Sequence, residues 1–149
     1  MCESSSVEVA YRAVMEGDFD WLLSLRRITM DSHLRASGDE PLEEVHCEAV
    51  LTDFEWTRII IVSGQDIGMV KLVKQSSPWH LRQIQIEPDF QGRGIGKIVL
   101  EEILQQAKGA SASIVLNVLR VNPAKELYGF LGFEVVDENE RAYKMLWCA

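Results

Sequence analysis

The sequence predicts a single α/β domain of the α+β kind, in which a mixed, mostly antiparallel sheet of six to seven strands carries helices on both faces. Its 149 residues suffice for one core that buries roughly 70% of the unfolded surface. Hydrophobic periodicity changes along the chain in the order strand, two helices, three strands, helix, strand, helix, two strands. Because no repeat or linker interrupts this order, residues 1–149 are expected to form one domain.

The first half of the chain predicts two helices between a first strand and a hairpin. Alternating apolar and polar residues indicate the first strand, and β-branched runs indicate the hairpin. Asp18 is expected to cap the first helix, and Pro41 to start the second. The segments are a strand over 7–12, helices from Asp18 to about 37 and from Pro41 to about 53, and strands over 56–62 and 67–74 around a turn at 63–66.

The second half predicts a strand that leads into a glycine loop and a helix, and then four further elements. Apolar residues recur every three or four positions from Ile95 to Ala107, which is typical of a helix with one buried face. The segments are a strand over 79–86, the helix from 95, a strand over 114–119, a helix after Asn122, and a closing hairpin of 133–136 and 142–147.

The glycine loop between the strand and this helix is the first candidate site. Gly92, Gly94 and Gly96 precede or open the helix, whose first N–H groups lack intrahelical partners and whose dipole attracts anions. The dinucleotide pattern fails because Lys97 stands where it needs a third glycine, and the P-loop pattern fails at Gln91. Phosphate is still the expected ligand, although a tight turn with close packing is the alternative.

A second motif lies 26 residues after Gly96 and runs from Asn122 to Phe133 as NPAKELYGFLGF. It resembles the signature N-x-x-A-x-x-L-Y-x-x-x-G-F of the GNAT N-acetyltransferase superfamily, with one residue fewer between Asn122 and Ala124. In addition, Gln91-x-x-Gly94-x-Gly96 resembles the pyrophosphate loop of that family. Both motifs occur in the family's order. The resemblance implies a single GNAT domain over 1–149 that uses acetyl-CoA as co-substrate.

The resemblance also implies a role for particular residues. The pyrophosphate would lie on the backbone of the loop, and the pantetheine amides would pair with the preceding strand as an added strand does. Asn122 would bind the pantetheine arm, unless it only caps its helix, and Tyr128 would protonate the thiolate, unless it is only a packed ring. The cofactor-binding residues are Ile84, Gln85, Ile86, Gln91, Gly92, Arg93, Gly94, Ile95, Gly96, Lys97 and Asn122.

The general base is harder to assign, because the strand before the loop has no carboxylate before Glu87. His80 is the nearest titratable residue, and its imidazole could accept a proton directly or through water. A structural histidine, with the proton passing to solvent, is the alternative. His33 and His46 lie on the first two helices, where they could face either substrate or solvent.

Composition narrows the function further. Fifteen Lys and Arg against 23 Asp and Glu give a net charge of −8, which disfavours nucleic acid and acidic lipid and fits a cationic acceptor. No apolar run approaches the roughly 20 residues of a membrane span, so a cytoplasmic protein is expected. Cys2, Cys47 and Cys148 are scattered, which predicts reduced thiols and no metal site. A homodimer is left open.

The expected function is therefore acetyl transfer from acetyl-CoA to a primary amine of a small molecule or peptide, by direct attack in a ternary complex. Tyr128 and His80 are the expected catalytic residues. The alternative is a GNAT-fold protein that binds acyl-CoA without catalysis, as a sensor. Phosphoryl transfer is disfavoured because the P-loop pattern fails.

Overall fold

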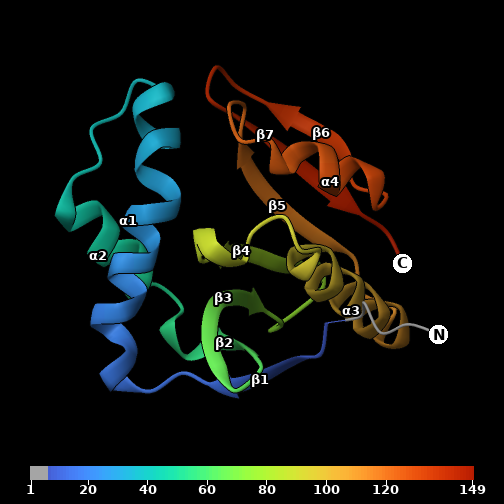
Figure 1. Ribbon diagram of the computed structural model, residues 1–149. Coiled ribbons are helices and arrows are strands. Elements are labelled where there is room, and N and C mark those ends of the chain that lie inside the picture. Colours follow the sequence, from blue (N-terminus) through green and yellow to red (C-terminus); the bar gives the residue numbers. More distant parts are fainter. Residues whose placement is uncertain (1–6) are drawn as a thin grey trace.

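A seven-stranded sheet forms the centre of the molecule in the computed structural model, which describes residues 7–149 (Figure 1). The strand order is β1-β2-β3-β4-β5-β7-β6. All neighbouring strands are antiparallel except β4 and β5. The strands are β1 Val9–Ala13, β2 Thr57–Val62, β3 Gln65–Val73, β4 Trp79–Ile86, β5 Ile114–Leu119, β6 Glu134–Glu138 and β7 Ala142–Trp147.

Within residues 7–149, four α-helices cover the two faces of this sheet. The helices are α1 Phe19–Ala36, α2 Glu43–Leu51, α3 Ile95–Ala110 and α4 Ala124–Phe130, with short 3-10 turns at Glu16–Asp18, Phe54–Trp56 and Pro88–Phe90. The predicted fold class and the order of the elements are confirmed. Several boundaries differ by one or two residues, among them those of β1 and β6, and α2 begins two residues after Pro41. The β2–β3 turn comprises only Ser63 and Gly64. Both of these turn residues have positive φ, as a two-residue hairpin turn of the primed type requires.

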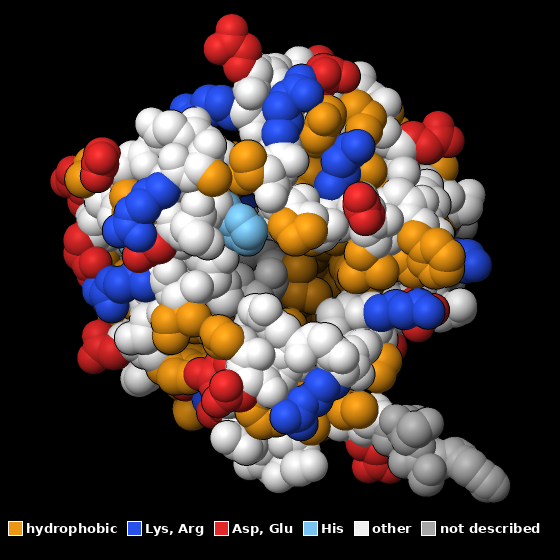
Figure 2. All heavy atoms as spheres, turned by 45° about the horizontal axis from the view of Figure 1, so that its top comes forward, with side chains coloured by type: hydrophobic (Ala, Val, Ile, Leu, Met, Phe, Trp, Pro, Cys, Tyr) orange, Lys and Arg blue, Asp and Glu red, His pale blue; other side chains and the backbone are white. Residues whose placement is uncertain are grey.

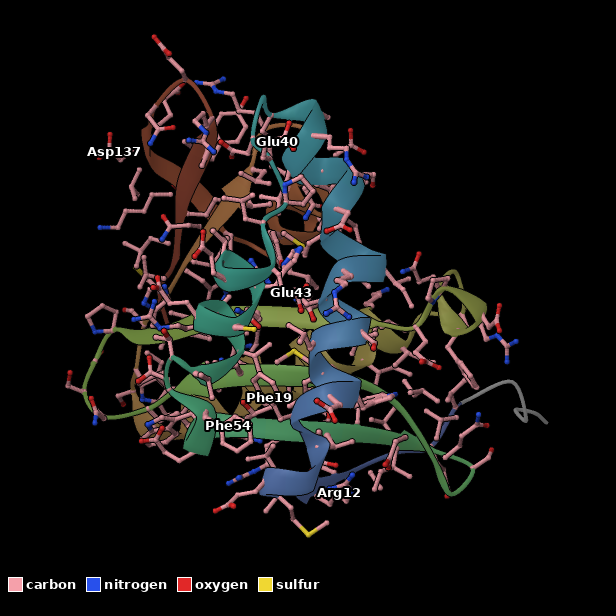
Figure 3. All side chains as sticks on the ribbon, turned by 90° about the vertical axis from the view of Figure 1, so that its left-hand side faces the viewer. Arg12, Phe19, Glu40, Glu43, Phe54 and Asp137 are labelled. Atoms are coloured by element: carbon pink, nitrogen blue, oxygen red, sulfur yellow. The ribbon has the colours of Figure 1, made fainter. Side chains whose placement is uncertain are left out.

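Alternating side chains of the strands supply two separate cores. On one face, Ile60, Val70 and Leu72 pack against α3 residues such as Val99 and Ile103. On the other face, Ile59 and Met69 pack against α1 and α2. Figure 3 views this second face, where α1 and α2 lie across the sheet and Phe19 and Phe54 add to its core.

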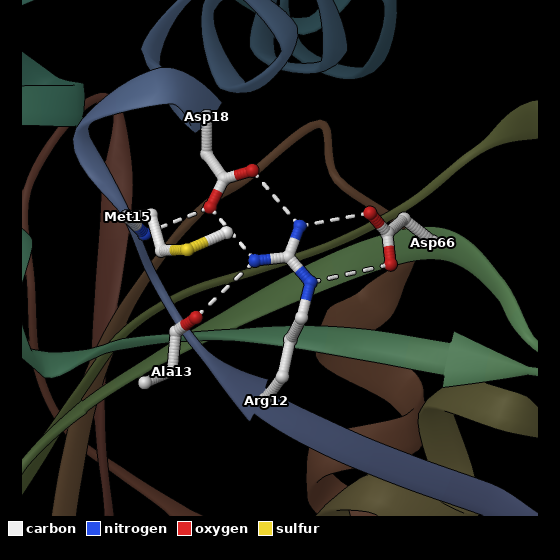
Figure 4. A network of polar contacts seen from close by, with 5 residues as sticks. All are labelled: Arg12, Ala13, Met15, Asp18 and Asp66. Carbon is white, nitrogen blue, oxygen red and sulfur yellow. Dashed lines mark hydrogen bonds and ion pairs between the residues drawn. The ribbon is translucent and has the colours of Figure 1, made fainter.

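The start of α1 is fixed to the sheet by Arg12 of β1 (Figure 4). Its guanidinium donates to both carboxylate oxygens of Asp18, at 2.9 and 2.8 Å, and to Asp66 of β3 at 2.8 Å. The bidentate pair with Arg12 lowers the pKa of Asp18. Asp18 occupies the N-cap position of α1, as predicted, but the side-chain cap bond is absent, because its carboxylate binds Arg12 and the Met15 amide.

The end of α2 is held by a lysine beneath it. Lys71 of β3 is fully buried, and its Nζ donates to the carbonyls of Ala49, Val50 and Thr52 at 2.9, 3.1 and 2.6 Å. These carbonyls lie at the negative end of the helix dipole, so a cation there stabilises them. Burial lowers the pKa of Lys71 to about 8, which leaves the ammonium form dominant at neutral pH.

Two further expectations concern membranes and thiols. Across residues 7–149, no helix is both long enough and apolar enough to span a bilayer. Cys47 and Cys148 are free thiols, as predicted, and Cys2 lies outside the described residues.

Lys71→Met should destabilise the protein, because it leaves carbonyls at the end of α2 without their donor. The expected loss is about 2 kcal/mol in the free energy of unfolding, measured by urea denaturation. Lys74→Met, at an exposed lysine just beyond the same strand, is the matched control and should change stability by less than about 0.5 kcal/mol. Equal stability of Lys71→Met and the parent would show that Lys71 does not hold α2.

Candidate functional site

The parallel strands β4 and β5 are paired at one end only. Trp79 pairs with Ile114 and His80 with Val115, and the pairing then stops. The two strands diverge beyond this point (Figure 1). Within the described chain, residues 81–86 of β4 therefore have no strand on their β5 side, and their peptide groups there are available to an added extended ligand.

Two adjoining hollows fill the space between the diverging strands. One, which we call the α3 hollow, has a volume of about 270 Å³ and reaches Gly96 and Leu100 of α3. The other, the β5 hollow, has a volume of about 210 Å³ and reaches residues 117–119 of β5. In Figure 2 the surface is hollowed near its centre, with hydrophobic side chains in its depth and a histidine at its rim. The two hollows share Met30, Ile84, Gln85, Asn122 and Tyr128.

Two local features shape β4 beside the hollows. The register passes from Leu72–Leu81 to Lys71–Gln83, so Arg82 is an extra, bulged residue. In β3, a Cβ atom at Gly68 would lie 2.4 Å from the Gln85 carbonyl oxygen, so only glycine allows this approach. Gly68 was not predicted from the sequence, although an isolated glycine inside a strand pattern is a signal of such close contact.

The glycine loop lies at the N-terminus of α3, as predicted. Gly92 and Gly94 have φ values of 77° and 79°, which favour glycine. Gly94 is the N-cap residue, and Ile98 makes the first bond back to it, at 3.1 Å, so the amides of the first turn are left for a ligand. Around the Cα positions of Gly92, Gly94 and Gly96 there is open space.

Three polar side chains of the loop have distinct positions. Gln91 donates from Nε2 to the Ile86 carbonyl at 2.9 Å, and its backbone amide bonds to Pro88, so it fixes the loop to the end of β4. Arg93 stacks on the Phe90 ring at 4.9 Å, and Lys97 lies 5.4 Å from the Phe130 ring of α4. Both cations lie on the segment that carries the free amides.

Asn122 is both a capping residue and a lining residue. Its Oδ1 accepts a hydrogen bond from the Ala124 amide at 3.0 Å, which stabilises the start of α4. The same residue lines both hollows. The two roles that the sequence left open for Asn122 are therefore compatible, because its Nδ2 donors are not needed for the cap.

Tyr128 of α4 also lines both hollows, although it is only 7% exposed. Its ring packs edge-on against Phe133 with centroids 5.8 Å apart. Burial raises the pKa of the Tyr128 phenol to about 12. The phenol is therefore fully protonated at neutral pH and can donate a proton into the hollows.

The structure does not bring His80 into the hollows. It lies where β4 and β5 are still paired, and neither hollow is lined by it. Burial, and to a smaller degree the charge of Arg82, lower its pKa. The catalytic role of His80, directly or through water, stays a prediction, and neither hollow supports it.

Residues of α1, which carry no recognisable motif, complete the lining. Arg26 and Met30 face the β5 hollow, and Thr29, Met30 and His33 face the α3 hollow. Their spacing of three and four places them on one side of the helix. No carboxylate lines either hollow, and among residues 7–149 no cluster of His, Cys, Asp and Glu suits a metal ion.

The fold is shared with many solved acetyltransferase structures. An N-acetyltransferase, PaiA, from Thermoplasma acidophilum in complex with coenzyme A aligns with a TM-score of 0.76 and 17% identity over 95% of this chain and 99% of that one. An acetyltransferase from Thermus thermophilus aligns with a TM-score of 0.72 and 22% identity over 95% of this chain and 97% of that one. Arabidopsis thaliana Naa50, in complex with the bisubstrate analogue CoA-Ac-MVNAL, aligns with a TM-score of 0.66 and 18% identity over 95% of this chain and 99% of that one.

Sequence comparison leads to the same family. No curated protein matches the chain. The family model described as "Acetyltransferase (GNAT) domain" matches residues 55–135, a segment that contains β4, the glycine loop and the Asn122–Phe133 motif. The chain belongs to the GNAT family of acetyltransferases.

Proposed function

We propose that this protein transfers the acetyl group of acetyl-CoA to a primary amine of a small molecule or peptide, by direct attack in a ternary complex. The observation that carries the proposal is the unpaired edge of β4, which lies between the free amides of α3 and the buried phenol of Tyr128. A thioester aligned along this edge would have a phosphate site at one end and a proton donor at the other.

The residues present fit acetyl-CoA. Amides from Gly92 to Lys97 suit the pyrophosphate, and Arg93 and Lys97 add positive charge there. The edge of Ile84, Gln85 and Ile86 suits the pantetheine amides, since residues 81–86 lack a partner strand on that side. Asn122 can donate from Nδ2 to the same arm while Oδ1 keeps α4 capped. These roles agree with those that the family resemblance implies.

The chemistry then needs one bond made and one broken. The amine nitrogen attacks the thioester carbonyl carbon, the carbon–sulfur bond breaks, and the thiolate takes the proton of the Tyr128 phenol. Because burial disfavours the phenolate and raises the pKa of Tyr128, this residue regains a proton from solvent once the thiol has formed.

The proton of the attacking amine has no carboxylate to accept it. Neither hollow is lined by Asp or Glu, and His80 lies outside both. We therefore assign this proton to solvent, with the amine entering in its neutral form. Titration of the substrate, not of the protein, then controls the rise of activity with pH.

One solved neighbour supports a peptide acceptor, since the Naa50 structure contains the bisubstrate analogue CoA-Ac-MVNAL. The PaiA N-acetyltransferase, solved with coenzyme A, supports the donor. The hollow volume of about 210 Å³ near α1 fits a small amine or the first residue of a peptide.

A non-catalytic acyl-CoA-binding protein is the second candidate, and the missing carboxylate in the hollows favours it. The test is release of free thiol from acetyl-CoA in the presence of a panel of amines. Release above the hydrolysis background supports catalysis. Tight binding of acetyl-CoA without release on any amine would instead identify a binding protein.

Gly94→Asp should weaken acetyl-CoA binding, because it places a carboxylate beside the predicted pyrophosphate site. Gly94→Asn is the matched control, since Asn and Asp have the same shape and both tolerate positive φ. Calorimetry at low salt should give at least about tenfold weaker binding for Asp than for Asn, and the gap should shrink as salt is added. Equal affinities of the two variants would place the phosphates elsewhere.

Tyr128→Phe should lower kcat by about tenfold or more, because the proton donor is lost while the ring still packs on Phe133. The KM for acetyl-CoA should change little. Tyr11→Phe, at a tyrosine whose hydroxyl donates to Glu102 outside both hollows, is the control and should keep the parental kcat. In the parent, kcat should show no alkaline fall from Tyr128 up to about pH 10. If Tyr128→Phe kept the parental kcat, Tyr128 would not be the proton donor and would serve only to pack against its neighbours.

The pH dependence of kcat/KM should be set by the pKa of the acceptor amine. If solvent takes the amine proton, kcat/KM rises through the pKa of the amine itself, and the rise moves to lower pH with a less basic amine. His80→Ala and His33→Ala should leave this profile in place. Loss of the rising limb in either variant would instead identify that histidine as the base.

A further inference from the structure

Arg26 is a buried cation whose hydrogen-bonding capacity is mostly unused. It is 9% exposed and lines the β5 hollow. Among the described residues, its one side-chain hydrogen bond is from Nε to Nδ1 of His46, at 3.0 Å. The Nη groups are not among the buried unpaired atoms of the described residues, so they are open to the hollow, where a ligand that accepts hydrogen bonds can reach them.

His46 holds Arg26 without neutralising it. The imidazole is 1% exposed, and its Nδ1 accepts the hydrogen bond from Arg26, so this nitrogen carries no proton. Its Nε2–H then donates to Asp31 Oδ1 at 2.7 Å. The chain Arg26–His46–Asp31 fixes the guanidinium by Nε alone, which leaves the Nη1 and Nη2 edge without an acceptor among residues 7–149.

The other charges near the hollow do not supply the missing partner. Arg82 also lines it, but this side chain is paired with Asp53 at 2.8 Å. The remaining lining residues are neutral. The charge of Asp31 raises the pKa of Arg26 against the larger lowering by burial, but the Oδ1 atom of Asp31 is hydrogen-bonded to His46 and not to Arg26. A guanidinium edge in a hollow of about 210 Å³ matches a carboxylate, which accepts two parallel N–H bonds.

We infer that the acceptor amine carries a carboxylate, which the Nη groups of Arg26 bind in the β5 hollow. This inference rests on the proposed acetyl transfer and narrows its substrate class to amino acids and related amino-carboxylates. It also differs from the expectation of a cationic acceptor, which rested on the net charge of −8. The whole chain is acidic, but the lining of the β5 hollow carries the positive side chains Arg26 and Arg82.

Arg26 is assigned to binding and specificity, not to bond making. The carboxylate would anchor one end of the acceptor, and the amine at the other end would face the thioester near Tyr128, which lines the same hollow. The positive charge would also favour the neutral form of a nearby amine, in keeping with proton release to solvent.

The test compares acceptors that differ only in this group. Amino acids and their carboxamides are assayed as pairs with acetyl-CoA, and rates are corrected for the neutral fraction of each amine. The parent should prefer the acid by about tenfold to a hundredfold in kcat/KM. Equal use of acid and amide would overturn the inference and leave acetyl transfer intact. No turnover with any amine would contradict the proposed function itself.

Arg26→Met removes the charge and keeps much of the length of the side chain. It should abolish the preference for the acid while acetyl-CoA affinity, measured by calorimetry, stays parental. Arg27→Met is the matched control, because Arg27 is the next residue of α1 and pairs with Glu43 away from both hollows; it should keep the preference. A uniform loss with acid and amide in Arg26→Met would mean that Arg26 serves the thioester instead.

Arg26→Lys covers the case in which the methionine variant does not fold. A lysine keeps the charge but not the bidentate edge, so the preference should fall but persist. Calorimetry of the amino acid binding to the CoA complex gives a second readout that needs no turnover. Binding that is unaffected by either substitution would contradict the assignment.

Discussion

The organisation of this protein depends on a sheet that is closed at one end and open at the other. β4 and β5 exchange hydrogen bonds at Trp79 and His80 and then separate. An unpaired strand edge normally invites aggregation, but here residues of α1 and α4 line the hollows beside it. The free peptide groups of β4 are therefore a binding surface protected by the rest of the fold.

Several contacts outside the hollows keep this opening in shape. Gly68 lets β3 approach the Gln85 carbonyl, and the bulge at Arg82 turns β4. On the other side, Lys71 holds the end of α2, and Arg12 holds the start of α1. Between those two anchors, α1 crosses the sheet and turns one side toward the hollows.

A contact at the far end of the molecule joins the two halves of the chain. The ion pair of Asp39 with Arg141 links the α1–α2 loop to the β6–β7 turn. Figure 3 labels Glu40 in the α1–α2 loop and Asp137 in β6, the strand that leads into this turn.

Features that depend on local sequence could be predicted: the glycine loop, the α3 periodicity and the Asn122–Phe133 motif each lie within a short segment. The distance over which β4 and β5 stay paired depends on residues far apart in the chain, so the sequence could not show that His80 lines neither hollow. Arg26 was not predicted because an arginine on an amphipathic helix usually lies in solvent, and only tertiary packing with His46 buries it. Asp18 was assigned to a cap because the competing partner, Arg12, comes from another element.

The central claim is that acetyl-CoA lies along the open edge of β4 with its phosphates on α3. Amide hydrogen exchange with and without coenzyme A measures this most directly. The account predicts slower exchange at amides within 82–86 and 92–97, with no change at the β1–β2 pair on the far edge of the sheet. Protection confined to other segments while coenzyme A is bound, such as the surface between β1 and α3, would contradict it.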